Sequence, residues 1–101
     1  MSINLKAITS CMGYQQITVL TTPQSLTVPT TNREGLNAKP TLALFIVEGQ
    51  AVRWRDDGIA PTPSVGMPTG AGMSFSYDGD LKNIKFVEQA PGAILNISYY
   101  A

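Results

Sequence analysis

The longest apolar run in the chain, Thr41–Val47, has hydrophobic side chains at both odd and even positions. Successive side chains of a strand point to opposite faces, so this run predicts a strand that is apolar on both faces. The two sets of side chains are Leu42, Leu44 and Ile46 on one face, and Ala43, Phe45 and Val47 on the other. Such a strand is usually central in its sheet and covered on both sides. We expect the cover to be either the second layer of a sandwich or another subunit.

A second strand-like run, 51–55, follows after a short turn at 48–50 that contains glycine. Two strands joined in this way are typical of a β-hairpin, so we interpret 41–55 as a hairpin at the centre of the domain. The return strand alternates between Val52 and Trp54 on one face and two arginines on the other. It therefore predicts one buried face and one charged face.

Shorter alternating runs fill much of the remaining chain, at 3–8, 14–21, 24–29, 73–77, 81–87 and 93–100. In the run at 14–21 we expect Ile17 and Val19 to face inward. The polar segment 30–40 predicts a long loop with room for one helical turn. The segment 59–71 contains three prolines and two glycines, so it predicts an extended stretch that no continuous strand can cross.

This pattern predicts an all-β protein of six to eight short strands, folded as a small antiparallel β-sandwich or barrel of jelly-roll-like type. At 101 residues the chain fits a single domain, 1–101, with an extended N-terminal arm at 1–8. The side chains that we expect in the core are Leu44, Phe45, Ile46, Trp54, Phe75, Phe86, Leu95 and Ile97.

Charge and composition narrow the function classes. Seven basic and seven acidic residues leave a formal net charge of zero, so the broad positive surface that nucleic-acid binding requires is not expected. No run approaches the ~20 apolar residues of a membrane span. The single cysteine, Cys11, cannot form an internal disulfide. We therefore expect a protein made in a reducing cytoplasm that binds neither nucleic acid nor membrane.

Candidate chemistry is sparse. The chain has no histidine, so it lacks Ser-His-Asp and Cys-His arrangements, and we expect no catalytic residues. The aspartates at 56–58 and 78–80 could bind Ca²⁺, but Asp-Gly is a common turn pair and the spacing matches no calcium loop. We therefore expect neither a metal site nor a cofactor, and we interpret Cys11 as an ordinary thiol.

The segment Arg53-Trp54-Arg55 allows two interpretations. Arginine beside an aromatic ring could hold a phosphate and stack on a base. In a strand, however, Trp54 points away from both arginines, which favours a core tryptophan with two surface arginines. Those arginines could form ion pairs with Asp56 or Asp57, or with carboxylates on a partner.

The second half of the chain carries a family resemblance. The segments VEGQAVRWRDDGIAPTPSVGMP, YDGDLKNIKFV and GAILNISYY resemble a group of small tailed-bacteriophage virion proteins, whose chains share a VRWRDDG-x-x-PT core and a closing L-N-x-S-Y-Y. The likeness covers roughly Leu42 to Tyr100. The run VRWRDDG, at Val52–Gly58, is its most specific part, and the first forty residues carry none of it.

This resemblance implies a non-enzymatic structural protein of the virion, a decoration or cement protein that binds and stabilises the outside of the assembled capsid shell. It implies the major capsid protein as partner and a homo-oligomer, a dimer or a trimer. The charged residues that we expect to contact the partner are Arg33, Glu34, Arg53, Arg55, Asp56 and Asp57. The alternative is a neck, tail or fibre component, including a receptor- or carbohydrate-binding module in which Tyr14, Tyr77 or Tyr100 stacks on a sugar.

Overall fold

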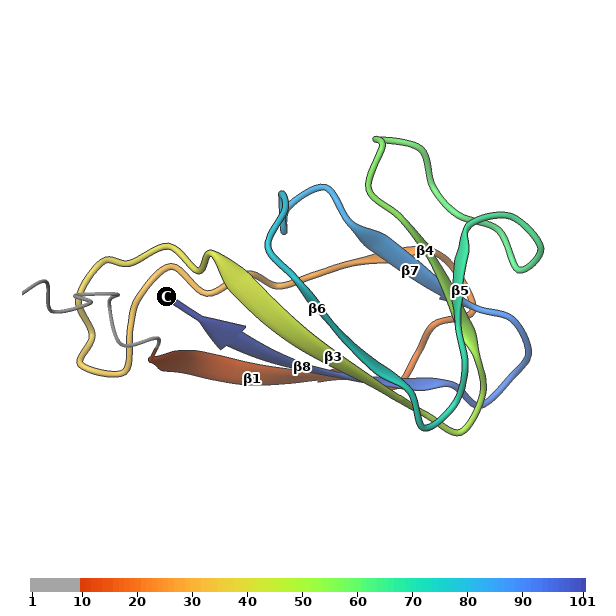
Figure 1. The fold of residues 1–101 in the computed structure, drawn as a ribbon, viewed down its shortest axis with the longest axis horizontal. Helices are drawn as coiled ribbons and strands as arrows, with labels where there is room; N and C mark the ends of the chain where they lie inside the picture. Colours follow the sequence, from red (N-terminus) through yellow and green to blue (C-terminus); the bar gives the residue numbers. More distant parts are fainter. Residues whose placement is uncertain (1–9) are drawn as a thin grey trace, which may run out of the picture.

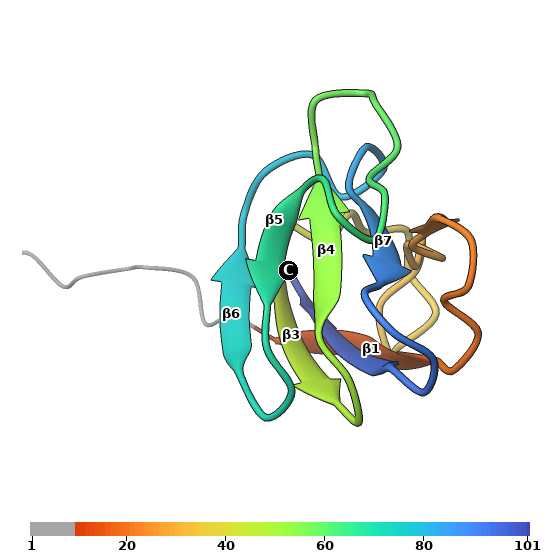
Figure 2. The ribbon, with the colours of Figure 1, turned by 90° about the vertical axis from the view of Figure 1, so that its right-hand side faces the viewer.

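The computed structural model describes residues 10–101, so the run at 3–8 and the arm at 1–8 lie outside the described residues. The described chain consists of strands and loops without a helix (Figure 1). Its strands are β1 Cys11–Ile17, β2 Gln24–Ser25, β3 Leu42–Glu48, β4 Val52–Arg55, β5 Met67–Thr69, β6 Ser74–Tyr77, β7 Lys85–Glu88 and β8 Ile94–Tyr100. They form two antiparallel sheets that pack face to face (Figure 2), which confirms the prediction of a small all-β sandwich.

The strand order identifies the topology. Sheet A has the order β1-β8-β3-β6 and sheet B the order β2-β7-β4-β5. A chain folded in half between β4 and β5 gives the antiparallel pairs β1·β8, β2·β7, β3·β6 and β4·β5, and all four pairs are present. Two further pairings, β3·β8 and β4·β7, complete the sheets as this ribbon wraps around the core. This arrangement is an eight-stranded jelly roll.

The predicted hairpin at 41–55 is wrong. β3 pairs with β8 and β6 in sheet A, whereas β4 pairs with β7 and β5 in sheet B, so the turn at 48–50 crosses from one sheet to the other. The reason is that β8 offers β3 a partner along all seven of its residues, from Leu42 opposite Tyr100 to Glu48 opposite Ile94. The four-residue β4 could not match that pairing.

The core lies between the two sheets. Sheet A supplies it with alternate residues of β3 and β8, and sheet B with Val52 and Phe86. Its aromatic centre is Phe45, whose ring centroid lies 4.9 Å from that of Phe75 and 5.0 Å from that of Phe86. Trp54 stacks on Phe75 at 5.4 Å and is half-buried at the side of this cluster. Of the eight expected core residues, those that are fully buried are Phe45, Phe86, Leu95 and Ile97.

Two of the expected core residues lie outside the core. Leu44 is half-buried and Ile46 is 41% exposed, because both point to the outer side of sheet A. The sandwich has only two layers, so even a central strand has one face without a cover. Val19, which we expected to face inward, is 63% exposed. The reason is that β1, and with it the alternation of inward and outward side chains, ends at Ile17. Leu20 enters the core instead.

The burial of Tyr99 predicts a loss of stability at high pH. Its ring lies in the core, its hydroxyl donates a hydrogen bond to Gln15 Oε1 at 2.7 Å, and burial raises the pKa of Tyr99 to about 12. In the unfolded chain the phenol ionises near pH 10. The folded protein holds this proton more tightly, so stability falls as the pH rises from about 10 towards 12.

Urea denaturation at several pH values between 8 and 12 measures this effect. The variant Tyr99→Phe cannot ionise at this position, so its stability should decline less steeply above about pH 10, whatever the lost hydrogen bond costs at neutral pH. An identical decline in both proteins would show that Tyr99 does not contribute.

Candidate partner-binding surfaces

The charged residues expected to bind a partner fall into two separate groups. Arg33 and Glu34 lie in the loop that leads into β3, at the end of the molecule where the C-terminus lies (Figure 1). The run 53–57 belongs to β4 and the loop after it, towards the other end. The structure therefore does not unite the six residues in one site.

Arg53 and Arg55 point to the side of β4 opposite Trp54, as the alternation predicts. Arg53 Nη1 donates a hydrogen bond to the carbonyl oxygen of Gly66 at 2.9 Å. Gly66 has a φ of +141°, and an added Cβ would lie 3.2 Å from the Cβ of Arg53. Arg53 thus fastens the end of the β4–β5 loop against β4, a use that the sequence did not indicate.

Arg55 forms the ion pair that the sequence predicted as one option. Its guanidinium donates to both carboxylate oxygens of Asp57, from Nε to Oδ1 at 3.0 Å and from Nη2 to Oδ2 at 2.5 Å. This bidentate hydrogen bonding lowers the pKa of Asp57 and raises that of Arg55. Both side chains are solvent-accessible, so the pair orients a charged surface more than it stabilises the fold.

Asp56 links three parts of the chain. Its Oδ2 accepts a hydrogen bond from the hydroxyl of Tyr77 at 2.7 Å, and its carbonyl oxygen accepts one from Asn83 Nδ2 at 3.1 Å. Burial and then the hydrogen bond to Asp56 raise the pKa of Tyr77 to about 12. Both carboxylates of the 56–58 turn are therefore engaged by protein donors. Within residues 10–101, no three His, Cys, Asp or Glu side chains gather in a way that could hold a metal ion.

A shallow pocket of about 380 Å³ lies beside the Arg55–Asp57 ion pair, and we call it the corner pocket. Its walls combine charged and apolar groups: Arg55, Asp56, Asp57, Val65, Gly66 and Met67. Val65 is 51% exposed and Met67 56% exposed, and Ile59 in the same loop is also exposed. Exposed apolar side chains ringed by charges are typical of protein–protein contact surfaces.

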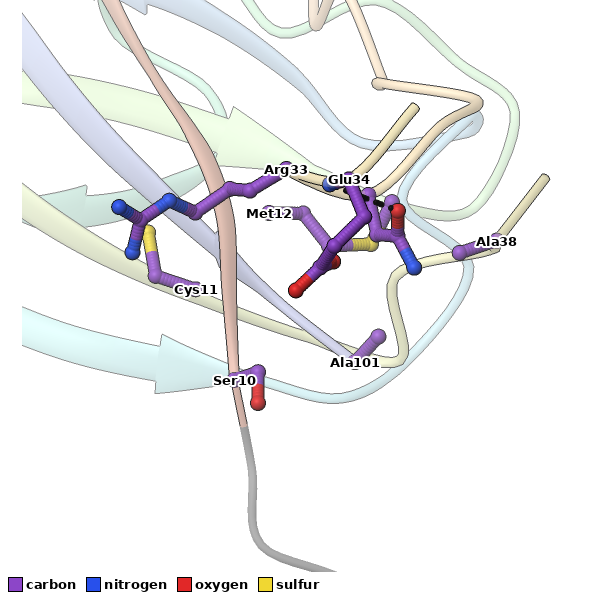
Figure 3. Close-up of a pocket in the computed structure, with 8 residues that line it drawn as sticks. Ser10, Cys11, Met12, Arg33, Glu34, Ala38 and Ala101 are labelled. Atoms are coloured by element: carbon purple, nitrogen blue, oxygen red, sulfur yellow. Dashed lines mark hydrogen bonds between the residues drawn. The ribbon is translucent and has the colours of Figure 1, made fainter. Parts of the chain in front are cut away.

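A second pocket, of about 560 Å³, lies at the opposite end and includes Arg33 and Glu34 (Figure 3). Asn32 shapes the loop, since its Oδ1 accepts hydrogen bonds from the backbone N–H groups of Glu34 at 3.0 Å and Leu36 at 2.9 Å. The loop contains no helical turn in the described structure. Cys11 borders the same pocket, with its Sγ 3.6 Å from Ser98 Oγ.

Only charged residues were expected to contact a partner, and this expectation left out one further surface. The outer side of sheet A, here called the sheet A face, is formed by Tyr14 and Gln16 of β1, alternate residues of β8 from Ile94 to Tyr100, alternate residues of β3 from Leu42 to Glu48, and Ser74 and Ser76 of β6. The sequence signal was the double-sided apolar run at 41–47, which left a second subunit open as its cover.

The three tyrosines considered as a sugar platform do not lie together. Tyr14 and Tyr100 are on the sheet A face, whereas Tyr77 belongs to the inner side of β6. Its ring packs edge-on against Trp54, with centroids 6.1 Å apart. A single aromatic platform built from all three side chains is therefore not present.

Comparisons with known proteins add no family to this description. The chain matches no protein-family model, no curated protein and no solved structure. In the part of the chain that the structure describes, no helix is long and apolar enough to cross a membrane.

Proposed function

We propose that this protein is a structural component of a tailed-phage particle that binds and stabilises the assembled capsid shell. The support comes from the resemblance of its sequence to small phage virion proteins and from where the resembling segments lie. VRWRDDG covers β4 and the turn that holds the Arg55–Asp57 ion pair, and LNISYY covers most of β8. Jelly rolls occur in viral capsid domains, and also in lectins and cupins, so the fold alone does not decide among these classes.

The corner pocket is the observation that carries the proposal. It presents a fixed ion pair next to exposed Val65 and Met67, which suits a partner surface with its own charged groups around an apolar projection. The major capsid protein would offer this surface in many copies. A protein that contacts two neighbouring subunits stabilises the assembled lattice by mass action, because the complete site exists only there.

Co-sedimentation with capsid shells that lack this protein tests the proposal. We expect saturable binding at a simple ratio to the capsid subunit. Val65→Asp should weaken binding about tenfold or more, because it places a charge among the apolar contacts of the pocket. Val19→Asp is the matched control, because Val19 is equally apolar, is 63% exposed and lies outside the pocket.

Equal binding by both variants would show that the corner pocket is not part of the interface. If the unaltered protein does not bind the shells, the alternative of a neck, tail or fibre component takes precedence. A glycan array would then test the carbohydrate-binding form of that alternative.

A further inference from the structure

We propose that the sheet A face is a dimer interface and that its occupant is the same face of a second copy of this chain. The proposal starts from β3, whose inner side chains are fully buried while the outer ones are not. Ile46 is 41% exposed, and Leu42 and Leu44 are only partly covered. Tyr14 of β1, at 63% exposure, lies on the same face, with Ser98 of β8 between it and Leu44.

Charge is distributed unevenly between the two sheets. The four strands of sheet A contain one charged residue, Glu48, at the end of β3. The shorter strands of sheet B contain four: Arg53, Arg55, Lys85 and Glu88. One side of the sandwich is therefore almost free of charge over its whole width.

Several polar groups of the sheet A face, centred on Asn96, have partners within the chain. Asn96 Oδ1 accepts hydrogen bonds from the hydroxyl of Tyr14 and, at 3.0 Å, from Gln16 Nε2. Asn96 Nδ2 donates to Glu48 Oε2 at 2.8 Å. Burying a polar group costs free energy chiefly when its hydrogen bonds are lost, so Tyr14, Gln16 and Asn96 can be covered at lower cost than unpaired groups.

These properties favour a second copy over another partner. In a two-fold dimer the same patch meets itself, so a charged patch would repel its own image, whereas this face carries a single charge, Glu48, at the end of β3. A partner with a charged surface would instead leave its charges buried without counter-ions against β3 and β8. The charges suited to such a partner lie in the corner pocket.

The size of the face suits a weak dimer. Three seven-residue strands, each about 24 Å long, and the four-residue β6, about 14 Å long, lie about 4.8 Å apart, so the flat footprint is about 410 Å² per copy before side-chain relief is added. Two copies therefore bury about 820 Å² or more, which is the size of a weak, transient interface. Sheets stacked in this way pack about 10 Å apart, as the two sheets of a sandwich do.

Light scattering on the free protein at about 100 μM tests this inference, because a weak dimer is populated only at a high protein concentration. We expect twice the chain mass of 10.8 kDa. Ile46→Lys should give monomers, because it buries a charge in each half of the interface. Ser76→Lys, on the exposed edge strand β6 opposite Leu44, is a second variant that does not alter a partly buried side chain.

Val65→Asp is the control, and it should remain dimeric because Val65 lies outside the sheet A face. A monomeric or trimeric unaltered protein would overturn the inference, and so would dimers that persist in both lysine variants. Thermal melts confirm that each variant is folded. No shells are needed, so failure here leaves the proposed function untouched, and failure of shell binding leaves the dimer untouched.

Discussion

Phe45→Ala is expected to lower the free energy of unfolding by about 3–5 kcal/mol. Phe45 has no exposed surface, and its ring lies against those of Phe75 and Phe86, which come from opposite sheets. The truncation removes the buried ring and leaves a cavity between the two layers. Domains of this size are stable by about 5–15 kcal/mol, so the loss is a large fraction of the total.

Chemical denaturation of the variant and of Trp54→Ala provides the comparison. Trp54 is larger but only half-buried at the side of the cluster, so its replacement should cost less than that of Phe45. The reverse order, or a loss near zero for Phe45→Ala, would mean that the centre of the core lies elsewhere.

Gly49→Ala is expected to destabilise the protein by about 2–5 kcal/mol through two additive effects. Gly49 has a φ of +78°, a conformation that costs an L-residue about 1–2 kcal/mol. An added Cβ would also overlap the backbone carbonyl oxygen of Gly92, in the turn before β8. Relieving that overlap requires a backbone shift, for which about 1–3 kcal/mol is typical.

Gly58→Ala separates the two effects. Gly58 has a nearly identical φ of +84°, but nothing lies within 4 Å of an added Cβ. Its replacement should therefore show only the conformational cost. The difference between the two variants measures the close approach of the 48–50 turn to Gly92. Equal losses would contradict the close approach of these two turns.

The sequence predicted the positions of the strands better than it predicted which strands pair with each other. Strict alternation located the strands around Phe75 and Leu95, because a half-buried strand imposes a period of two on its own residues. Whether the turn at 48–50 closes a hairpin or crosses between sheets depends on β8, which lies about fifty residues further along the chain. No local pattern contains that information.

The same limit applies to the candidate surfaces. Arg55 and Asp57 are two residues apart in the chain, so the local sequence was sufficient to suggest their ion pair. The contact of Arg53 with Gly66 depends on how the intervening loop returns. The sequence did not show whether Ile46 points outward or inward, because the side chains on both sides of that strand are apolar. The hydrogen bonds of Asn96 arise from the register of three strands.

Electron microscopy of empty shells saturated with this protein tests the proposal of a shell-binding jelly roll most directly. We expect extra density at fixed positions on the outer surface of the shell, into which the sandwich fits with the corner pocket against the capsid subunits and the sheet A face against a second copy. Shells without added density, or density in which the corner pocket points to solvent, would contradict it.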